Sequence, residues 1–154
     1  MIFDLLLMEK FMEKILISAC LMGDIVRYDG RQKKMTHALI HRWAAQGRLV
    51  PFCPEVAGGL STPRPPAEIV NGDGQEVLEQ RAKIWTSAGE DVTPQFVRGA
   101  LMALDLIKSH AIKFAILKAK SPSCGSEFIY DGTFKNKYLY DFICLTIPLI
   151  LPKS

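Results

Sequence analysis

Three short apolar runs stand out in the hydropathy pattern, and each one ends at a turn rich in glycine, proline or serine. The runs cover residues 14–19, 49–52 and 113–118, with the sequences KILISA, LVPF and KFAILK. None has the spacing of an amphipathic helix, and continuous apolar runs of this length are typical of strands buried in a parallel sheet. The pattern therefore predicts three buried parallel strands.

Two segments between these runs have helical periodicity. In the first, Thr36 is a suitable N-cap and Gly47 predicts the end of the helix. In the second, Thr93 as N-cap and Pro94 at the first helical position predict a helix that runs to about His110. The apolar face of that helix is formed by Val97, Ala100, Leu101, Leu104 and the stem of Lys108.

The alternation of strands and helices implies right-handed crossovers and predicts an α/β fold of three layers. We expect a Rossmann-like or flavodoxin-like fold, in which a mostly parallel sheet has helices on both faces. Residues 58–74 are rich in proline and glycine, which predicts largely irregular structure,. Ordered loops of this length usually carry function.

Composition adds limits to this picture. A chain of 154 residues with 49% hydrophobic and 23% charged residues is typical of one soluble globular domain,. The net charge of +3 is small and the basic residues are scattered, which disfavours a nucleic-acid partner. The sequence contains no indication of an oligomeric state.

Cysteines supply the candidate chemistry. Cys20, Cys53 and Cys124 each follow one of the three predicted strands, and the carboxyl ends of parallel strands share one edge of a sheet. We therefore expect the three thiols to converge on one site. Three thiolates would leave a tetrahedral metal ion, or one iron of a cubane cluster, with an open position. Cys144 lies in the apolar run DFICLTIPLIL and is expected to be a small core residue.

Free cysteines in a metal or catalytic role indicate a reducing compartment, so we expect a cytoplasmic protein. The sequence ISAC at Cys20 has the form of a lipoprotein cleavage site. However, Glu9, Lys10, Glu13 and Lys14 interrupt the apolar core that a signal peptide requires,. The apolar part of the C-terminal segment is too short to span a bilayer, and no membrane partner is expected.

Other polar residues lie in the same turns as the cysteines. Glu55 is two residues from Cys53 and is a candidate general acid or base, although most glutamates are surface residues. Ser121 and Ser123 immediately precede Cys124, and their hydroxyls would face whatever this cysteine binds. Arg64, between two prolines, is a candidate clamp for an anionic or carbonyl group of a substrate,.

Taken together, the motifs SACLMG, VRYDG, PFCPEVAGGLSTPRPPAEI, DVTPQF, LKAKSPSCGS and IYDGTF resemble those of the DUF523 family, which includes bacterial 2-thiouracil desulfurases. The resemblance covers residues 12–134. It implies that Cys20, Cys53 and Cys124 hold a [4Fe-4S] cluster whose fourth iron has no protein ligand. It also implies that Glu55 and Ser121 are catalytic, with Ser123 in the same motif.

The resemblance further implies the reaction. A small thiolated pyrimidine, as base or nucleoside, would exchange C=S for C=O and release sulfide without consuming electrons. Three alternatives remain at this point. The cysteines could form a zinc module with His37 or His41 as fourth ligand, the substrate could be thiolated tRNA, or the protein could be a redox enzyme, although it lacks a G-x-G-x-x-G fingerprint.

Both ends of the chain depart from the family pattern. We expect residues 1–11 to be an extension or the product of a start codon assigned too far upstream, and residues 12–134 to form the desulfurase domain. Residues 135–154 lack the expected closing helix. This atypical tail is expected to result from a frameshift or truncation; the alternative is a divergent strand that covers the sheet in another way.

Overall fold

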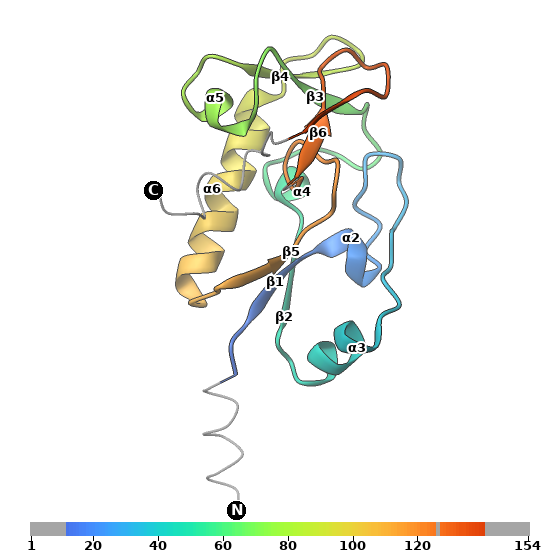
Figure 1. Cartoon of the computed structure of the whole chain (residues 1–154), viewed down its shortest axis with the longest axis vertical. Coiled ribbons are helices and arrows are strands. Elements are labelled where there is room, and N and C mark those ends of the chain that lie inside the picture. The colour runs from blue at the N-terminus through green and yellow to red at the C-terminus, as the bar shows by residue number, and fades with distance from the viewer. Residues whose placement is uncertain (1–11, 126, 141–154) are drawn as a thin grey trace, which may run out of the picture.

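The computed structural model describes residues 12–125 and 127–140. Within these residues the three predicted strands form one parallel sheet in the order β2-β1-β5 (Figure 1). The strands are β1 (Ile15–Ser18), β2 (Leu49–Phe52) and β5 (Phe114–Ile116). Ile15 pairs with Leu49 on one side and with Phe114 on the other. All three carboxyl ends therefore lie at one edge, and the prediction of three parallel strands is confirmed.

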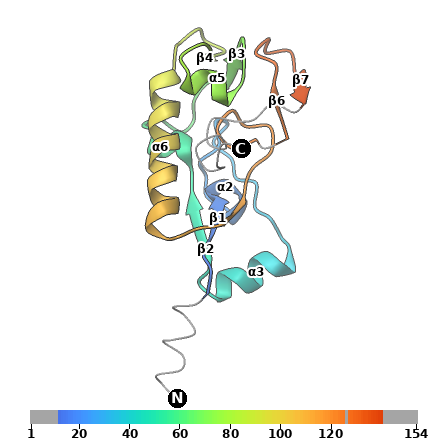
Figure 2. The ribbon, with the colours of Figure 1, turned by 60° about the vertical axis from the view of Figure 1, so that its left-hand side comes forward.

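Helices cover both faces of this sheet. Leu16 of β1 packs with Ile107 of α6 (Thr93–Ser109), whereas its neighbour Ile17 packs with Ile40 of α3 (Ala38–Ala45). Successive strand residues point to opposite faces, so α6 and α3 lie on opposite sides of the sheet, as Figure 2 shows. Burial of each of these side chains contributes about 1.5–3 kcal/mol.

The two predicted N-caps are each displaced by one residue. His37, and not Thr36, caps α3, because its Nδ1 accepts a hydrogen bond from the Leu39 N–H at 3.2 Å. Thr93 is the first residue of α6, and its hydroxyl oxygen accepts a hydrogen bond from the Ile84 N–H at 2.9 Å. The first displacement comes from a local contact of His37 and the second from a contact of Thr93 with β4 (Lys83–Thr86), so capping preferences alone do not fix where a helix begins,.

The remaining strands pair in antiparallel fashion. β3 (Ala67–Val70) pairs with β4 (Lys83–Thr86), and β6 (Phe128–Tyr130) pairs with β7 (Tyr138–Tyr140). Residues 58–74 are largely irregular, as predicted, but β3 is a regular strand within them. Ile69 of β3 is buried with Ile84 and Phe96, partners that only the tertiary fold supplies. The described residues thus form a mixed α/β fold around a parallel sheet of three strands.

Three short helices complete the described elements and are α2 (Ala19–Met22), α4 (Pro54–Ala57) and α5 (Gly74–Leu78). β7 falls in the segment 135–154 that was expected to be atypical, and it forms a regular strand against β6. Residues 1–11 and 141–154, including Cys144, lie outside the described residues. The expectations for the N-terminal extension, for the rest of the tail and for Cys144 stay predictions.

α4 approaches α6 at two glycines. A Cβ atom on Gly99 of α6 would collide with the carbonyl oxygen of Pro54, and one on Gly58 would collide with the carbonyl oxygen of Gln95. Only glycine permits such close backbone contact. The contact fixes the position of α4, which carries Glu55 and directly follows Cys53.

Gly99→Ala is therefore expected to lower the free energy of unfolding by about 1–3 kcal/mol, as overpacking usually does. The loss would occur although alanine is the better helix former. Urea denaturation measures it, with Leu101→Ala as the control, because Leu101 is exposed and does not belong to the buried face of α6, although the sequence predicted that it would. Equal stability of the Gly99→Ala variant and the wild type would contradict a fixed contact between α4 and α6.

Candidate active site

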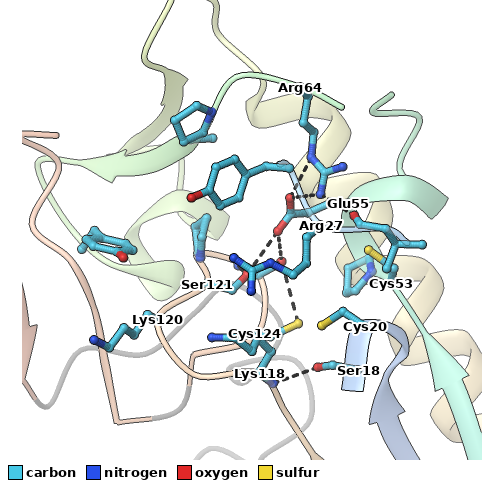
Figure 3. A pocket seen from close by; sticks show the side chains of 18 of the residues that line it. Ser18, Cys20, Arg27, Cys53, Glu55, Arg64, Lys118, Lys120, Ser121 and Cys124 are labelled. Carbon is cyan, nitrogen blue, oxygen red and sulfur yellow. Dashed lines mark hydrogen bonds and ion pairs between the residues drawn. The ribbon is translucent and has the colours of Figure 1, made fainter. Parts of the chain in front are cut away.

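Each of the three predicted cysteines follows one strand of the parallel sheet. Cys20 lies in α2 directly after β1, Cys53 lies between β2 and α4, and Cys124 lies in a turn after β5. All three line a cavity of about 320 Å³, and Figure 3 shows their sulfur atoms turned toward one another. The structure therefore brings together the thiols that the sequence singled out.

The donors that these three residues bring to the cavity are soft sulfur atoms. Among residues 12–125 and 127–140, no three His, Cys, Asp or Glu side chains lie close enough together to hold a single ion. In an iron–sulfur cluster each thiolate binds a different iron, so its sulfur ligands stand farther apart. Three soft sulfur donors around one cavity suit such a cluster.

Burial raises the pKa of the Cys20 and Cys53 thiols above the ordinary value. For Cys20, desolvation is the largest cause and the negative charge of Cys53 is the next, while Lys118 and Arg27 act in the opposite direction. For Cys53, desolvation again dominates and is opposed by the main-chain N–H of Val56. Two thiolates in this setting require compensating positive charge, which bound iron would supply.

Glu55 of α4 connects this helix, which follows Cys53, to the turn that contains Cys124. Its Oε1 accepts hydrogen bonds from the hydroxyls of Ser121, at 3.2 Å, and Ser123, at 2.8 Å. Its Oε2 accepts hydrogen bonds from Nε and Nη2 of Arg64, at 3.0 and 2.6 Å (Figure 3). Both carboxylate oxygens are thus held in fixed directions, and Oε1 reaches the hydroxyls that border the cavity.

Ser121 and Ser123 belong to the tight turn that presents Cys124. The carbonyl oxygen of Ser121 accepts hydrogen bonds from the N–H groups of Cys124 and Gly125, at 3.3 and 2.8 Å. The two serine hydroxyls lie 2.9 Å apart, and Ser123 is buried. The turn therefore places two hydroxyl groups between the thiol and the carboxylate.

Protein acceptors surround the guanidinium of Arg64. Besides Glu55, it donates hydrogen bonds to the carbonyl oxygens of Val26, at 3.1 Å, and Ser61, at 3.0 Å, and to the Thr62 hydroxyl. Its side chain is only 7% exposed. These contacts favour a role in holding Glu55, and the clamping of a substrate by Arg64 stays a prediction.

The variant Arg64→Lys separates these two roles. Lysine keeps the charge but loses the planar pair of donors, so the orientation of Glu55 should relax. We expect kcat to fall by about tenfold while KM stays within about twofold, the sign of a lost transition-state contact. Steady-state kinetics of sulfide release measure both constants. Arg48→Lys, at a residue that does not line the cavity, is the control. A rise in KM at unchanged kcat would instead indicate a substrate clamp.

Several residues that line the cavity carry no role in the sequence interpretation. They are Arg27, Tyr28, Glu68, Lys118, Lys120 and Tyr130. Burial lowers the pKa of Lys118, and the charge of Arg27 adds to this shift. The sequence could have indicated Lys118 as a cavity residue by its position alone, since Lys118 lies just past the end of β5. The positive charges of Arg27, Lys118 and Lys120 make one side of the cavity favourable for anionic groups.

The two histidines that could have served as the fourth ligand of a zinc ion do not lie at the cysteine cavity. His37 uses its Nδ1 to cap α3, and neither His37 nor His41 is among the described residues that line the cavity. This placement disfavours a zinc module in which a histidine completes the cysteine set.

The fold and the site define a class of α/β proteins with a sulfur-rich cavity at the carboxyl edge of a small parallel sheet. Comparison with known proteins gives the family. The family model described as 2-thiouracil desulfurase matches residues 15–141, and the chain belongs to this family. The resemblance in the sequence motifs is thus confirmed.

Two relatives illustrate the similarity. The uncharacterized protein YbbK of Bacillus subtilis (strain 168) is 47% identical over 126 residues, which cover 80% of this chain and 80% of that protein. A solved structure of the [4Fe-4S]-dependent thiouracil desulfidase TudS is 46% identical, with a TM-score of 0.78. That match covers 90% of this chain and 85% of TudS. No helix in the described part of our chain is long and apolar enough to cross a membrane.

Proposed function

We propose that this protein removes sulfur from a thiolated pyrimidine base or nucleoside, replaces C=S by C=O and releases sulfide. The observation that carries this proposal is the convergence of three thiols and a carboxylate–serine network on one cavity. Membership of the 2-thiouracil desulfurase family and similarity to a [4Fe-4S]-dependent desulfidase support it.

We assign the fold to the Rossmann-like or flavodoxin-like class, of which three parallel strands with helices on both faces form the central layers. In open α/β sheets of this class, ligands bind outside the carboxyl ends of the strands. The cavity lies at those ends, because Cys20 and Cys53 follow β1 and β2 directly. The position of the cavity is therefore consistent with a substrate site.

Cys20, Cys53 and Cys124 would hold the [4Fe-4S] cluster. When bound, the cluster would supply an iron without a protein ligand, which acts as a Lewis acid with affinity for sulfur. The thiols must lose their protons as the cluster binds. Arg27 and Lys118, whose charges favour the ionised form of Cys20, would also favour an anionic sulfide beside it.

Glu55 and Ser121 would handle protons during the reaction. Replacement of C=S by C=O consumes one water molecule and yields one hydrogen sulfide, so protons move from water to nitrogen or sulfur while no electron is transferred. Glu55 Oε1 already accepts two hydroxyl hydrogen bonds, and it would take a proton from water or pass one to a ring nitrogen. Ser121 would hold the base or the departing sulfur through its hydroxyl.

Anaerobic reconstitution with iron and sulfide tests the proposal. The protein should become brown, its visible spectrum should shift on addition of 2-thiouracil, and sulfide should appear in solution. A protein that never takes up iron, or one that holds stoichiometric zinc after anaerobic preparation, would count against the desulfurase and in favour of a zinc scaffold.

A further inference from the structure

Glu68 is a buried carboxyl group that the proposed chemistry leaves without a role. It lies on β3, is 7% exposed and lines the cavity. In the described part of the chain it forms no ion pair. Desolvation raises its pKa and the charge of Asp131 adds to this shift, while hydrogen bonds from the main-chain N–H groups of Phe134 and Gly132 partly offset it. A buried acidic group without a cation is unfavourable, so its retention in the cavity wall calls for an explanation.

Two contacts of Glu68 are structural, because the main-chain N–H groups of Phe134 and Gly132 both donate hydrogen bonds to its carboxyl group. Its Oε2 accepts a hydrogen bond from the N–H of Phe134 at 3.0 Å, which anchors the loop between β6 and β7 against β3. The loop also packs closely at Gly132, where a Cβ atom would lie 2.6 Å from the carbonyl oxygen of Ile69. A carboxyl group has about four acceptor positions, so these two N–H groups leave about half of them for other partners.

Aromatic rings accompany Glu68 in the cavity wall. Tyr28 and Tyr130 also line the cavity. Burial and a hydrogen bond with Tyr138 raise the pKa of Tyr130 to about 12, and the charges of Tyr28 and Glu68 contribute, which shows that these groups are neighbours. β3 and β6, which carry Glu68 and Tyr130, are in contact and lie above the parallel sheet in Figure 1.

This combination suits a flat heterocycle. An aromatic ring offers a stacking surface, and a buried carboxyl group offers an acceptor for a ring N–H. In 2-thiouracil the C=S carbon lies between two ring N–H groups. A base whose sulfur points toward the thiols would therefore have an N–H edge available to a different wall of the same cavity.

We propose that Glu68 is a specificity-determining residue whose carboxylate accepts a hydrogen bond from a ring N–H of the thiolated pyrimidine. The inference rests on the proposed function for the identity of the ligand. It assigns to Glu68 the selection and orientation of the base, and it leaves the chemistry to Glu55 and Ser121.

The variant Glu68→Gln separates recognition from anchoring of the loop. The N–H groups of Phe134 and Gly132 require an acceptor, so the glutamine amide oxygen should face the loop and the NH₂ group should face the cavity. The loop contact is kept, while the acceptor for the ligand becomes a donor. Because burial disfavours ionised Glu68 as the pH rises above its unfolded pKa, glutamine should leave stability at neutral pH equal or higher.

Calorimetry on the reconstituted protein in a Glu55→Gln background, where turnover is expected to be slow, measures the Kd of 2-thiouracil and of its 1-methyl and 3-methyl derivatives. We expect Glu68→Gln to weaken binding of 2-thiouracil by about tenfold or more. One methylated ligand, which lacks the N–H that Glu68 binds, should bind equally to variant and wild type. The other methylated ligand should keep the tenfold difference.

Asp131→Asn is the matched control, because Asp131 bonds Thr133 within the same loop but does not line the cavity. Its Kd values should equal those of the wild type. Unchanged binding of 2-thiouracil by Glu68→Gln, an equal loss for all three ligands, or no binding to the wild type would overturn the inference. If binding follows the expected pattern but the protein with Glu55 intact releases no sulfide, the proposed function fails while the role of Glu68 stands.

Discussion

Replacement of Cys20, Cys53 or Cys124 by serine is expected to abolish stable cluster binding, and with it all release of sulfide. Each thiol lines the same cavity at the end of a different strand, so no neighbouring cysteine among the described residues can substitute for the missing ligand. Serine preserves the size of the side chain but is a much poorer ligand for iron. Iron and acid-labile sulfide per protein chain, together with the visible spectrum after anaerobic reconstitution, measure the effect.

Cys144→Ser is the control for these three variants. We expect it to retain iron, since Cys144 is predicted to be an ordinary apolar residue. Thermal unfolding of each apo variant should resemble that of the wild type, because a thiol-to-hydroxyl change alters volume little. Loss of iron from Cys144→Ser to the same extent as from the other three would overturn the assigned ligand set.

Glu55→Gln is expected to reduce kcat by about 10²–10⁴-fold, the usual contribution of a general acid or base, while iron content stays unchanged. Arg64 donates two hydrogen bonds to Oε2, so the glutamine should keep its oxygen there and place its NH₂ group near the serines. The serine hydroxyls can accept hydrogen bonds from that group. The geometry of the network is then preserved, and only the capacity to take up a proton is lost.

Steady-state sulfide release and iron content, measured on the same preparation, distinguish catalysis from cluster retention. Glu90→Gln, at an exposed glutamate, should leave both unchanged. Two results would count against a proton-transfer role: wild-type turnover by Glu55→Gln, or loss of activity in strict proportion to loss of iron. The second result would make Glu55 a structural support of the Cys124 turn.

The cysteine site was predictable because it depends on topology. Short apolar runs specify buried parallel strands, parallel strands share one carboxyl edge, and a residue that follows such a strand must lie near that edge. Cys20, Cys53 and Cys124 satisfy this condition in the sequence alone. The cluster itself was implied by the resemblance in the motifs.

The partners of Glu55 and the burial of Glu68 could not be predicted in the same way. The contact between Glu55 and Ser121 joins residues 66 positions apart, and the bond from Arg64 depends on the path of an irregular loop. Glu68 is buried because β3 pairs with β4 and supports the loop at Phe134. Neither feature has a local signature, and the same tertiary dependence explains why Thr93 bonds Ile84 and does not cap α6.

A non-redox exchange of sulfur for oxygen is tested most directly by turnover in water enriched in oxygen-18, without any added reductant, after anaerobic reconstitution. It predicts that 2-thiouracil yields uracil containing one oxygen-18 atom and an equal amount of sulfide, over many cycles. Product formation that requires a reductant, or uracil that carries no oxygen from water, would contradict a non-redox exchange of sulfur for oxygen at this site.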